Sequence, residues 1–483
     1  MNRQNFYGHL ALALAVIMVA AFVGQMRRVQ QQWHDAPPAP SVEQSVEPSD
    51  EVAGDADTDA EEASDAEVIV RFRPGTTKEA VNRLTAQLND RVEDRFEFID
   101  NEAVIADEDG LDAQAVAAEY RALPQVLYAE PNFDIELDPQ EGEANDAVGG
   151  SDASAFARGV PSDPLFGEQW SLANTGQRDG KGGADISALR AWEKTKGSDK
   201  VVVAVLDTGV DYTHADLRHN MWVRPNSLAP YTDAELGTID DRYGFNAADT
   251  DGDPMDDNGH GTHCAGIVGA EGDNADGIAG VNWHVEIMPL KFMSANGSGT
   301  VKDAIECINY VIERKRAGVN VRVISASWGS TMYSRALEDA IRRAGEEGIL
   351  FVAAAGNSST NNDRQPHYPS NYQLPNVLSV AALTRLDVLA RFSNYGAKTV
   401  HLAAPGAEIM STWPGDQYEE HSGTSMATPE VSGVAALVLS VSPDLSVREL
   451  RARLLESVDK LPALDGKVSS GGRLNAARAV HAE

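Results

Sequence analysis

The sequence predicts an α/β domain, in which a parallel sheet is flanked by helices, preceded by a small α+β domain. Continuous apolar runs such as VVVAVLD, VRVISASW and GILFVAAAGN are typical of strands that are covered on both faces. Segments between them, such as VKDAIECINYVIERKRAG, have helical periodicity. Before residue 161 the pattern differs, because short alternating strands and two amphipathic helices share residues 67–137.

The bulk composition excludes some classes of partner. The chain has 483 residues, enough for more than one domain, and its formal net charge is −34. Nucleic-acid binding requires clustered Lys and Arg, so this charge argues against it, whereas solubility and cation binding fit an acidic chain. The two cysteines, Cys264 and Cys307, are too few for a disulfide framework and indicate no redox compartment.

The N-terminus predicts export. Residues 10–23, LALALAVIMVAAFV, form an apolar run flanked by arginines, which fits a signal peptide within residues 1–26. An uncleaved membrane anchor through the same run is the alternative, and either reading places the protein in an extracellular or periplasmic location. Residues 27–66 are rich in proline and acidic side chains, so we expect a disordered linker.

Residues 67–138 are predicted to form the small α+β domain. VIVRF, FEFID and AVIA have strand patterns, and TTKEAVNRLTAQLN and LDAQAVAAEYRAL have helical spacing. The polar, glycine-containing residues 139–160 predict a linker that a protease could cut. Residues 161–483 then form the larger α/β domain.

Polar residues follow the predicted strands of the larger domain at their carboxyl ends, where α/β sheets collect functional groups. Asp207 ends one strand in DTG, and Asn357 ends another in AAAGN. His260 begins the helix of NGHGTHCAGIVGA, and Ser425 precedes an apolar helix in HSGTSMATPE. Each has a structural alternative as a turn or cap residue. Gly423 and Ala427, however, leave clearance around Ser425 that a cap does not need.

The order of these residues separates the candidate chemistries. DTG also resembles the aspartic protease motif, but the chain has no second DTG or DSG. His260, His263 and Cys264 lack the second ligand pair of a zinc site, and we expect His263 to be structural. An imidazole held by a carboxylate can accept a hydroxyl proton. The order Asp, His, Ser differs from that of the α/β-hydrolases and of chymotrypsin.

The motifs DTGVDYTHADL, HGTHCAGIVGA, SASWGS, AAAGN and GTSMATP resemble the subtilisin-like serine proteases over about residues 161–480, and HGTHC is similar to their thermitase and proteinase K branches. The resemblance implies a serine endopeptidase that acts through an acyl-enzyme. Ser425 would be the nucleophile and His260 the base, oriented by Asp207. Asn357 and the Ser425 backbone N–H would form the oxyanion hole.

The resemblance further implies polypeptide substrates that lie extended between two segments. The residues of these segments are Gly297, Ser298, Gly299, Ser327, Trp328 and Gly329. At the base of the first specificity pocket the matching segment is His367-Tyr368-Pro369, where relatives often have a smaller residue before Tyr, so the pocket would be shallower or more polar.

Structural Ca²⁺ is the cofactor that the resemblance implies, since hard oxygen ligands suit this ion. The ligands of the first site would be Asp163, Asp216, Asn274, Asp276 and the carbonyls of Glu271 and Ile278. A second, weaker site would use Asn246, Asp249, Asp251 and Asp253. Solvated surface acids are the alternative for this second group.

Residues 67–138, with VIVRFRPG and LYAEPNF, resemble the ferredoxin-like subtilisin propeptide, a foldase and inhibitor whose tail occupies the active-site cleft. The alternative is an unrelated small domain. We expect a monomeric zymogen that cleaves itself within residues 137–161. Glu430 is a departure, because relatives usually carry histidine after GTSMATP, and we expect altered packing and pH response rather than lost catalysis. The competing function is a non-catalytic peptide-binding relative.

Overall fold

The structure is a computed structural model that describes residues 66–96, 101–139, 159–233 and 237–482. The predicted signal peptide or anchor, the acidic linker and most of the linker at 139–160 lie outside these ranges, as does most of the predicted strand FEFID. The described residues fall within one structural unit, Ser64–Glu483, which holds two subdomains.

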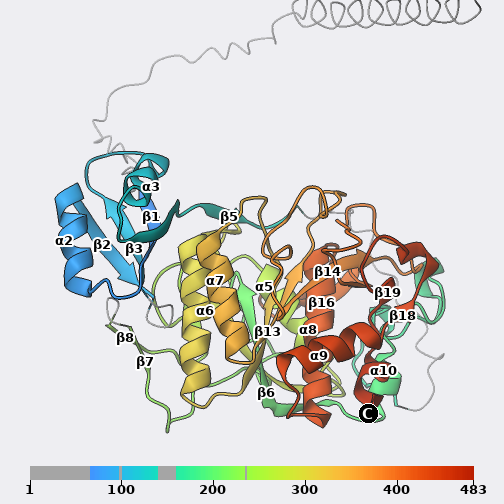
Figure 1. Cartoon of the computed structure of the whole chain (residues 1–483). Coiled ribbons are helices and arrows are strands. Elements are labelled where there is room, and N and C mark those ends of the chain that lie inside the picture. The colour runs from blue at the N-terminus through green and yellow to red at the C-terminus, as the bar shows by residue number, and fades with distance from the viewer. Residues whose placement is uncertain (1–65, 97–100, 140–158, 234–236, 483) are drawn as a thin grey trace, which may run out of the picture. The chain divides into compact units, whose positions relative to one another are not determined.

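The first subdomain is a four-stranded antiparallel sheet with two helices, which confirms the predicted α+β domain (Figure 1). The strand order is β2-β3-β1-β4. The side chain of Thr77 caps α2, and that of Asp112 caps α3, so both helices begin where an oxygen accepts from the first free N–H groups. The elements are β1 (Glu67–Phe72), α2 (Lys78–Leu88), β2 (Asp90–Arg95), β3 (Glu102–Asp107), α3 (Ala113–Arg121) and β4 (Val126–Pro131).

The second subdomain is built on a nine-stranded sheet of order β18-β19-β15-β14-β13-β12-β6-β10-β9, as the predicted fold class requires. All its strand pairs are parallel except β18 with β19. The strands are β6 (Gly197–Asp207), β9 (Phe245–Asn246), β10 (His284–Lys291), β12 (Val321–Ala326), β13 (Leu350–Ala354), β14 (Val377–Leu383), β15 (Leu402–Pro405), β18 (Asp459–Lys460) and β19 (Gly472–Arg473).

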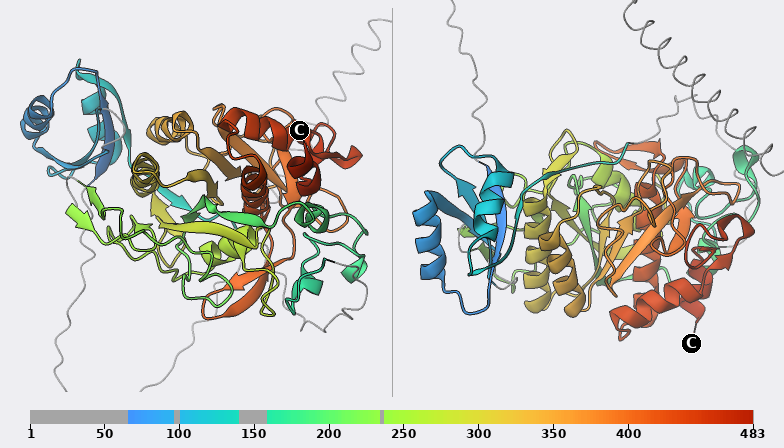
Figure 2. Two further views of the ribbon diagram at one scale, coloured as in Figure 1. Left: turned by 90° about the horizontal axis from the view of Figure 1, so that it is seen from below. Right: turned by 45° about the horizontal axis from the view of Figure 1, so that its top comes forward.

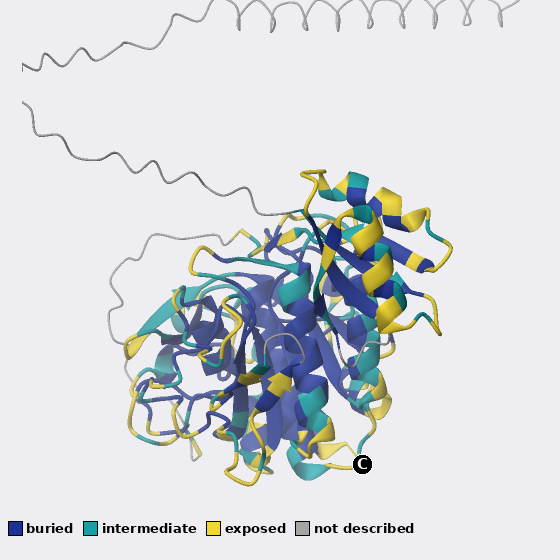
Figure 3. Cartoon of the chain, turned by 90° about the vertical axis from the view of Figure 1, so that its left-hand side faces the viewer, coloured by how far each residue is buried: buried dark blue, intermediate teal, exposed yellow. Residues whose placement is uncertain are grey.

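Both faces of this sheet are covered, which explains why its strands are continuous apolar runs. Successive residues of β6 point to opposite faces: Val203 and Val205 enter the core under α5 and α8, whereas Ala204 and Leu206 enter the core under α6 and α7. Figure 3 shows the strands of the sheet as buried, with exposed residues mainly on loops and outer helix faces.

The helices of the second subdomain begin at recognisable caps. Thr300 and Asp303 form a capping box at α6, Ser446 and Glu449 form one at α9, and Ser334 caps α7. Helices α6 and α7 lie side by side (Figures 1 and 2). The bounds are α4 (Ala188–Trp192), α5 (His260–Gly269), α6 (Val301–Arg316), α7 (Arg335–Glu346), α8 (Thr424–Val441), α9 (Val447–Glu456), α10 (Ala476–His481) and the 3₁₀ turns η2 (Phe166–Glu168), η3 (Gln177–Asp179) and η4 (Pro462–Leu464).

Short antiparallel pairs complete the fold. Strands β16 (Ile409–Trp413) and β17 (Gln417–His421) form a hairpin, as do β7 (Tyr231–Asp233) and β8 (Gly237–Ile239). Strand β5 (Asp134–Glu136) belongs to the tail of the first subdomain and pairs with β11 (Ser298–Thr300) of the second. One helix of the described ranges, α8, is long and apolar enough to cross a membrane, but it is buried in the core.

Candidate active site

Asp207 and His260 form a buried pair at the carboxyl end of β6. The Nδ1 atom of His260 lies 2.6 Å from Oδ1 of Asp207, and both side chains are almost fully buried. A glycine permits the close approach of α5 to the end of β6, since a Cβ on Gly261 would lie 2.0 Å from the carbonyl oxygen of Gly209. The first turn of α5 therefore presents its histidine to the strand-end carboxylate.

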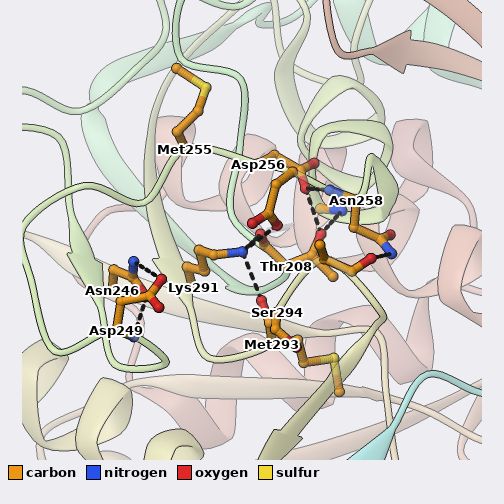
Figure 4. A network of polar contacts seen from close by, with 12 residues as sticks. Thr208, Asn246, Asp249, Met255, Asp256, Asn258, Lys291, Met293 and Ser294 are labelled. Atoms are coloured by element: carbon orange, nitrogen blue, oxygen red, sulfur yellow. Dashed lines mark hydrogen bonds and ion pairs between the residues drawn. The ribbon is translucent and has the colours of Figure 1, made fainter. Parts of the chain in front are cut away.

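The loop before α5 is held by Asp256, which the sequence did not single out. Its buried carboxylate accepts hydrogen bonds from Thr262 Oγ1 at 2.6 Å, from Thr208 Oγ1 at 2.9 Å and from the backbone N–H groups of Asn258 and Gly259. Figure 4 shows Asp256 between Thr208 and Asn258. Because Thr208 follows Asp207 and the loop leads into His260, Asp256 fixes the two members of the pair relative to each other.

A buried lysine stabilises the same strand ends. Nζ of Lys291, the last residue of β10, donates to the carbonyl oxygens of Thr208 and Met293 and to the carboxylate of Asp257 at 2.6 Å (Figure 4). The carboxylate of Asp257 thus pairs the buried charge of Lys291, because a buried ammonium group without such a partner is costly. The sequence analysis assigned no role to Lys291, although a lysine at the end of an apolar strand could have indicated a buried, paired charge.

The carboxylate raises the basicity of His260. Burial alone disfavours the imidazolium, but the charge and hydrogen bond of Asp207 outweigh it, with smaller contributions from Asp256 and Asp138, so the pKa of His260 lies above 6.5. Nε2 of His260 is buried and has no hydrogen-bond partner among the described residues. The ring therefore offers one free nitrogen on the side opposite Asp207.

Ser425 lies in the first turn of α8, beside the end of β12. Its Oγ donates to the carbonyl oxygen of Ser327 at 3.0 Å, while Ser327 Oγ donates to the carbonyl oxygen of Ser425 at 2.9 Å. The serine hydroxyl is buried and faces the Ser327 carbonyl rather than an imidazole nitrogen. No hydrogen bond joins Ser425 Oγ to Nε2 of His260 in the described residues, and active-site hydrogen bonds often form only with bound substrate.

Asn357 is oriented by the same turn of α8. Its Oδ1 accepts from the N–H and from Oγ1 of Thr424, both at 2.9 Å, which leaves Nδ2 to donate elsewhere. Nδ2 donates to the carbonyl oxygen of Pro139 at 3.2 Å. A Cβ on Gly423 would lie 3.3 Å from this Nδ2 and 3.4 Å from the Ser425 nitrogen, so the glycine keeps the space between the two donors open.

Cys264 lies beside the pair, as its position one turn after His260 predicted. One sulfur, nitrogen and carboxylate oxygen of Cys264, His260 and Asp207 lie within 4.8 Å of one another, the one such group of three potential metal ligands in the described ranges. Burial raises the pKa of the Cys264 thiol well above 9, and Nδ1 of His260 already faces Asp207. Because Nδ1 is already engaged by the carboxylate, the contacts of this group are those of an oriented imidazole.

His263 is absent from this group, as expected for a structural histidine. Its Nε2 lies 3.1 Å from the carbonyl oxygens of Ile409 and Glu419, which belong to the hairpin β16–β17. Burial lowers its pKa well below 6.5, with His421 and His260 adding to the effect. A neutral ring that bridges α5 to the hairpin explains the second histidine of the motif.

The predicted substrate segments differ in what the structure places on them. Gly297, Ser298 and Gly299 hold an extended chain: β5 pairs with β11, and Leu137 N–H donates to the Gly297 carbonyl oxygen at 2.9 Å. The Trp328 side chain instead lies in the core, where Nε1 donates to the Leu206 carbonyl oxygen at 2.8 Å. Trp328 can therefore contribute only its backbone to a bound peptide.

The first predicted calcium group converges around two carboxylates. Asp216 accepts from Asn274 Nδ2 at 2.7 Å and from Ile278 N–H at 2.9 Å, and its carbonyl oxygen accepts from Glu271 N–H. Asp163 accepts from Asn274 N–H on the same loop, where Asn274 Oδ1 accepts from Asp276 N–H. Burial, with smaller contributions from the neighbouring acids Asp163 and Asp276, raises the pKa of Asp216 to about 6. A bound cation would relieve this repulsion.

The second predicted calcium group forms a tight loop. Nδ2 of Asn246 donates to the Asp249 carboxylate at 2.9 Å, and Asp253 N–H donates to the Asp251 carboxylate at 2.9 Å. The Asp253 carboxylate accepts from Tyr212 at 3.0 Å. By the 4.8 Å distance that joins the ligand atoms of Asp207, His260 and Cys264, neither the three carboxylates of this group nor the acids of the first group meet at one point. These contacts are those of a polar turn.

The first subdomain docks on α6 and α7 through charged groups as well as apolar ones. Glu130 accepts from Ser334 Oγ at 2.5 Å and from the N–H groups of Arg335 and Ala336, so it caps the N-terminus of α7. Arg71 pairs with Asp339 on the same helix. The tail that continues from this interface reaches the Ser425 region through β5.

Comparison with known proteins agrees with this arrangement. A model of the subtilase family matches residues 198–472, and a model of the fervidolysin N-terminal prodomain matches residues 51–132, starting ahead of the boundary predicted at residue 67. The thermophilic serine proteinase of Bacillus sp. (strain AK1) is 34% identical, with 86% of this chain and 87% of that relative covered. Thermitase from Thermoactinomyces vulgaris is 35% identical, with 66% of this chain and 99% of thermitase covered.

A solved structure supports the fold. The crystal structure of fervidolysin from Fervidobacterium pennivorans, described as a keratinolytic enzyme related to subtilisin, matches with a TM-score of 0.66 and 24% identity. The match covers 87% of this chain and 61% of that chain. At this identity the likeness concerns the fold.

Proposed function

This chain belongs to the subtilase family of serine proteases and carries an N-terminal prodomain, and from this premise we propose that Ser425, His260, Asp207 and Asn357 carry out its endopeptidase reaction. The observation that carries the assignment is the buried pair of Asp207 and His260, 2.6 Å apart, with Nε2 of the ring free. Activation of a serine hydroxyl needs an imidazole with one nitrogen held by a carboxylate and the other free to accept the proton.

In the proposed reaction, Ser425 Oγ attacks the carbonyl carbon of the scissile peptide bond while His260 Nε2 takes the hydroxyl proton. The amide of Asn357 and the Ser425 N–H donate to the oxyanion, and the positive end of α8 faces the same charge. His260 then gives the proton to the leaving amine, which leaves an acyl ester on Ser425. Water, deprotonated by the same imidazole, hydrolyses the ester and restores the serine.

A fluorophosphonate label separates this function from peptide binding without catalysis. The processed protein should gain one label at Ser425, identified by mass spectrometry, because the reagent reacts with activated serines only. His260→Ala should not label, whereas His284→Ala, which removes an exposed histidine at the start of β10, should label normally. Absence of labelling in the processed protein would favour the peptide-binding alternative.

We also propose that the chain is a zymogen that cleaves itself within residues 137–161. The support is the position of the tail, because Leu137 pairs with Gly297 and the Pro139 carbonyl accepts from the Asn357 amide. Ser425→Ala, expressed in a protease-deficient host, should keep its prodomain, while the parent chain loses it. Normal maturation of that variant would contradict self-cleavage.

Calcium at the first acidic group is a further proposal. The residues fit a hard cation, because the Asp163 and Asp216 carboxylates are buried beside each other and accept only from neutral donors in the contacts described. A chelator should lower the melting temperature of the inactive Ser425→Ala protein. Asp216→Asn should abolish this effect, whereas Asp249→Asn, in the second group, tests whether that loop contributes. An unchanged melting temperature with chelator would exclude both sites.

Export is the final part of the proposed function. Residues 10–23 support it, and the proposal favours a signal peptide over the membrane anchor because this apolar run is short for a full membrane span. Mass spectrometry of the N-terminus of the uncleaved Ser425→Ala chain, together with fractionation of medium and membranes, tests this. Full-length protein retained in the membrane fraction would favour the anchor.

A further inference from the structure

A histidine lies beneath the tail of the prodomain, next to the active site. Nε2 of His367 lies 3.1 Å from Oδ1 of Asp138, and their side chains are only 7% and 9% exposed. Asp138 directly follows Leu137, whose N–H binds the Gly297 carbonyl in the substrate segment. The carboxylate therefore sits where a side chain of an extended substrate would enter the protein.

The imidazole fills a slot between two strand ends. A Cβ on Gly329, after β12, would lie 2.1 Å from Cε1 of His367, and one on Gly356, after β13, would lie 3.0 Å from its Cδ2. Only glycine at these two places leaves room for the ring. His367 thus lies between the segments that carry Ser327 and Asn357 and contacts the prodomain tail through Asp138.

The position of the ring is fixed by a buried turn. The His367 carbonyl oxygen accepts from Ser370 Oγ at 2.7 Å and from Asn371 N–H at 2.9 Å, and its N–H donates to Asn371 Oδ1. With the backbone held, Nε2 is the ring atom that meets the tail. Among the described residues Nδ1 of the ring has no hydrogen-bond partner, so replacing Asp138 with an apolar side chain would leave a second buried ring nitrogen unpaired, which is costly.

From this geometry we propose that His367 makes the first specificity pocket, to which the family resemblance assigns this residue, selective for acidic side chains, so that the enzyme prefers substrates with Asp or Glu at the position of Asp138. This inference rests on the proposed function and names its substrate class. The prodomain tail is then the built-in ligand of the pocket. In the tail the Asn357 amide reaches the carbonyl of the next residue, Pro139, so the selected residue lies within two residues of the cut on its amino side.

The chemistry discriminates against other occupants. A carboxylate accepts a hydrogen bond from Nε2–H, and the charge of this acceptor makes the hydrogen bond charge-assisted. An aliphatic or aromatic side chain at this position would leave Nε2 of His367 without a hydrogen-bond partner. Sites built to hydrogen-bond a substrate group reject the analogue that lacks it far better than apolar pockets reject a change of size.

The test uses the processed wild-type enzyme and a library of peptides from a digested proteome, with cut sites read by mass spectrometry. We expect Asp and Glu to be enriched at one of the two positions before the cut. For the best site, two quenched fluorescent peptides that differ only in Glu against Gln should then differ about fivefold or more in kcat/KM, because both side chains accept from Nε2–H but only the carboxylate makes the stronger, charge-assisted hydrogen bond.

His367→Leu should bring this Glu/Gln ratio to about one, while His284→Gln, at an exposed position, should keep it. Fluorophosphonate labelling of each variant reports whether the active site is folded. If the wild-type enzyme cuts peptides with no preference for Asp or Glu, the acidic pocket is refuted although the protease function stands. If the enzyme neither cuts nor labels, the proposed function itself fails. A ratio that survives in His367→Leu would also overturn the role of the histidine.

Discussion

Glu430 should make the stability of this protease fall as the pH rises through neutrality. The residue lies in α8, 1% exposed, and one carboxylate oxygen has no hydrogen-bond partner among the described residues. Burial raises its pKa to about 8, a hydrogen bond with Ser171 acts in the opposite direction, and the charge of Asp185 adds to the rise. In the unfolded chain the same carboxyl titrates near 4.5.

Between pH 4.5 and about 8 the folded state holds a proton that the unfolded chain has released. Raising the pH over this window therefore removes stability, by about 1.4 kcal/mol per pH unit. At pH 7 the loss reaches about 3 kcal/mol, and near pH 8 it reaches about 5 kcal/mol and then stays constant, because both states are ionised. Glutamine has nearly the same shape and does not titrate, so Glu430→Gln should escape this loss.

The assay is chemical denaturation of the Ser425→Ala protein, which cannot digest itself, with and without Glu430→Gln at pH 5 to 9. All other titrations are common to both proteins, so the difference in unfolding free energy isolates residue 430. We expect the difference to grow in favour of the Glu430→Gln variant up to about pH 8, while Glu456→Gln, an exposed glutamate of α9, should give a flat difference. If unfolding is irreversible, melting temperatures at one scan rate rank the proteins. Parallel stability profiles with and without Glu430→Gln would refute a buried, protonated carboxyl.

Three further predictions concern the active site. Gly423→Ala should lower kcat about tenfold or more, because the added Cβ would crowd the two donors to the oxyanion. Stability should change little, since the extended backbone at residue 423 accepts any residue. Unchanged kcat would contradict this placement of the oxyanion hole. The kcat/KM of the processed enzyme should rise with pH through a midpoint above 6.5, because the neutral form of His260 is the base and Asp207 raises its pKa. A midpoint below 6.5 would contradict the pairing of His260 with Asp207. A mercurial should inactivate the enzyme slowly through the buried thiol of Cys264. Cys264→Ala should resist the reagent, while Cys307→Ala should stay sensitive. Equal sensitivity of the two variants would exclude inactivation through Cys264 beside His260.

The family and the fold class were readable from the sequence, and the comparisons confirm them, whereas the domain boundaries stay predictions. Continuous apolar runs and apolar residues at helical spacing are local sequence patterns, so they predict the buried strands and the helices directly. The strand-end residues Asp207 and Asn357 and the helix-start residues His260 and Ser425 follow from the rule that parallel strands gather their ends at one edge. Their catalytic roles stay predictions until the labelling experiment is done.

Which side chains meet across long sequence distances was decided only by the tertiary structure. The sequence places Asp256 four residues before His260 but does not show that it accepts from Thr208, which lies 48 positions earlier. Likewise His367 and Asp138 are 229 residues apart, and their contact depends on how the prodomain tail enters the slot between Gly329 and Gly356. Local periodicity encodes elements and their faces, whereas the charge, burial and partners of a side chain depend on the packing of every element around it. The chemistry of this protease could therefore be recognised from its motifs, but the acidic pocket and the protonated Glu430 could be inferred only once the chain was folded.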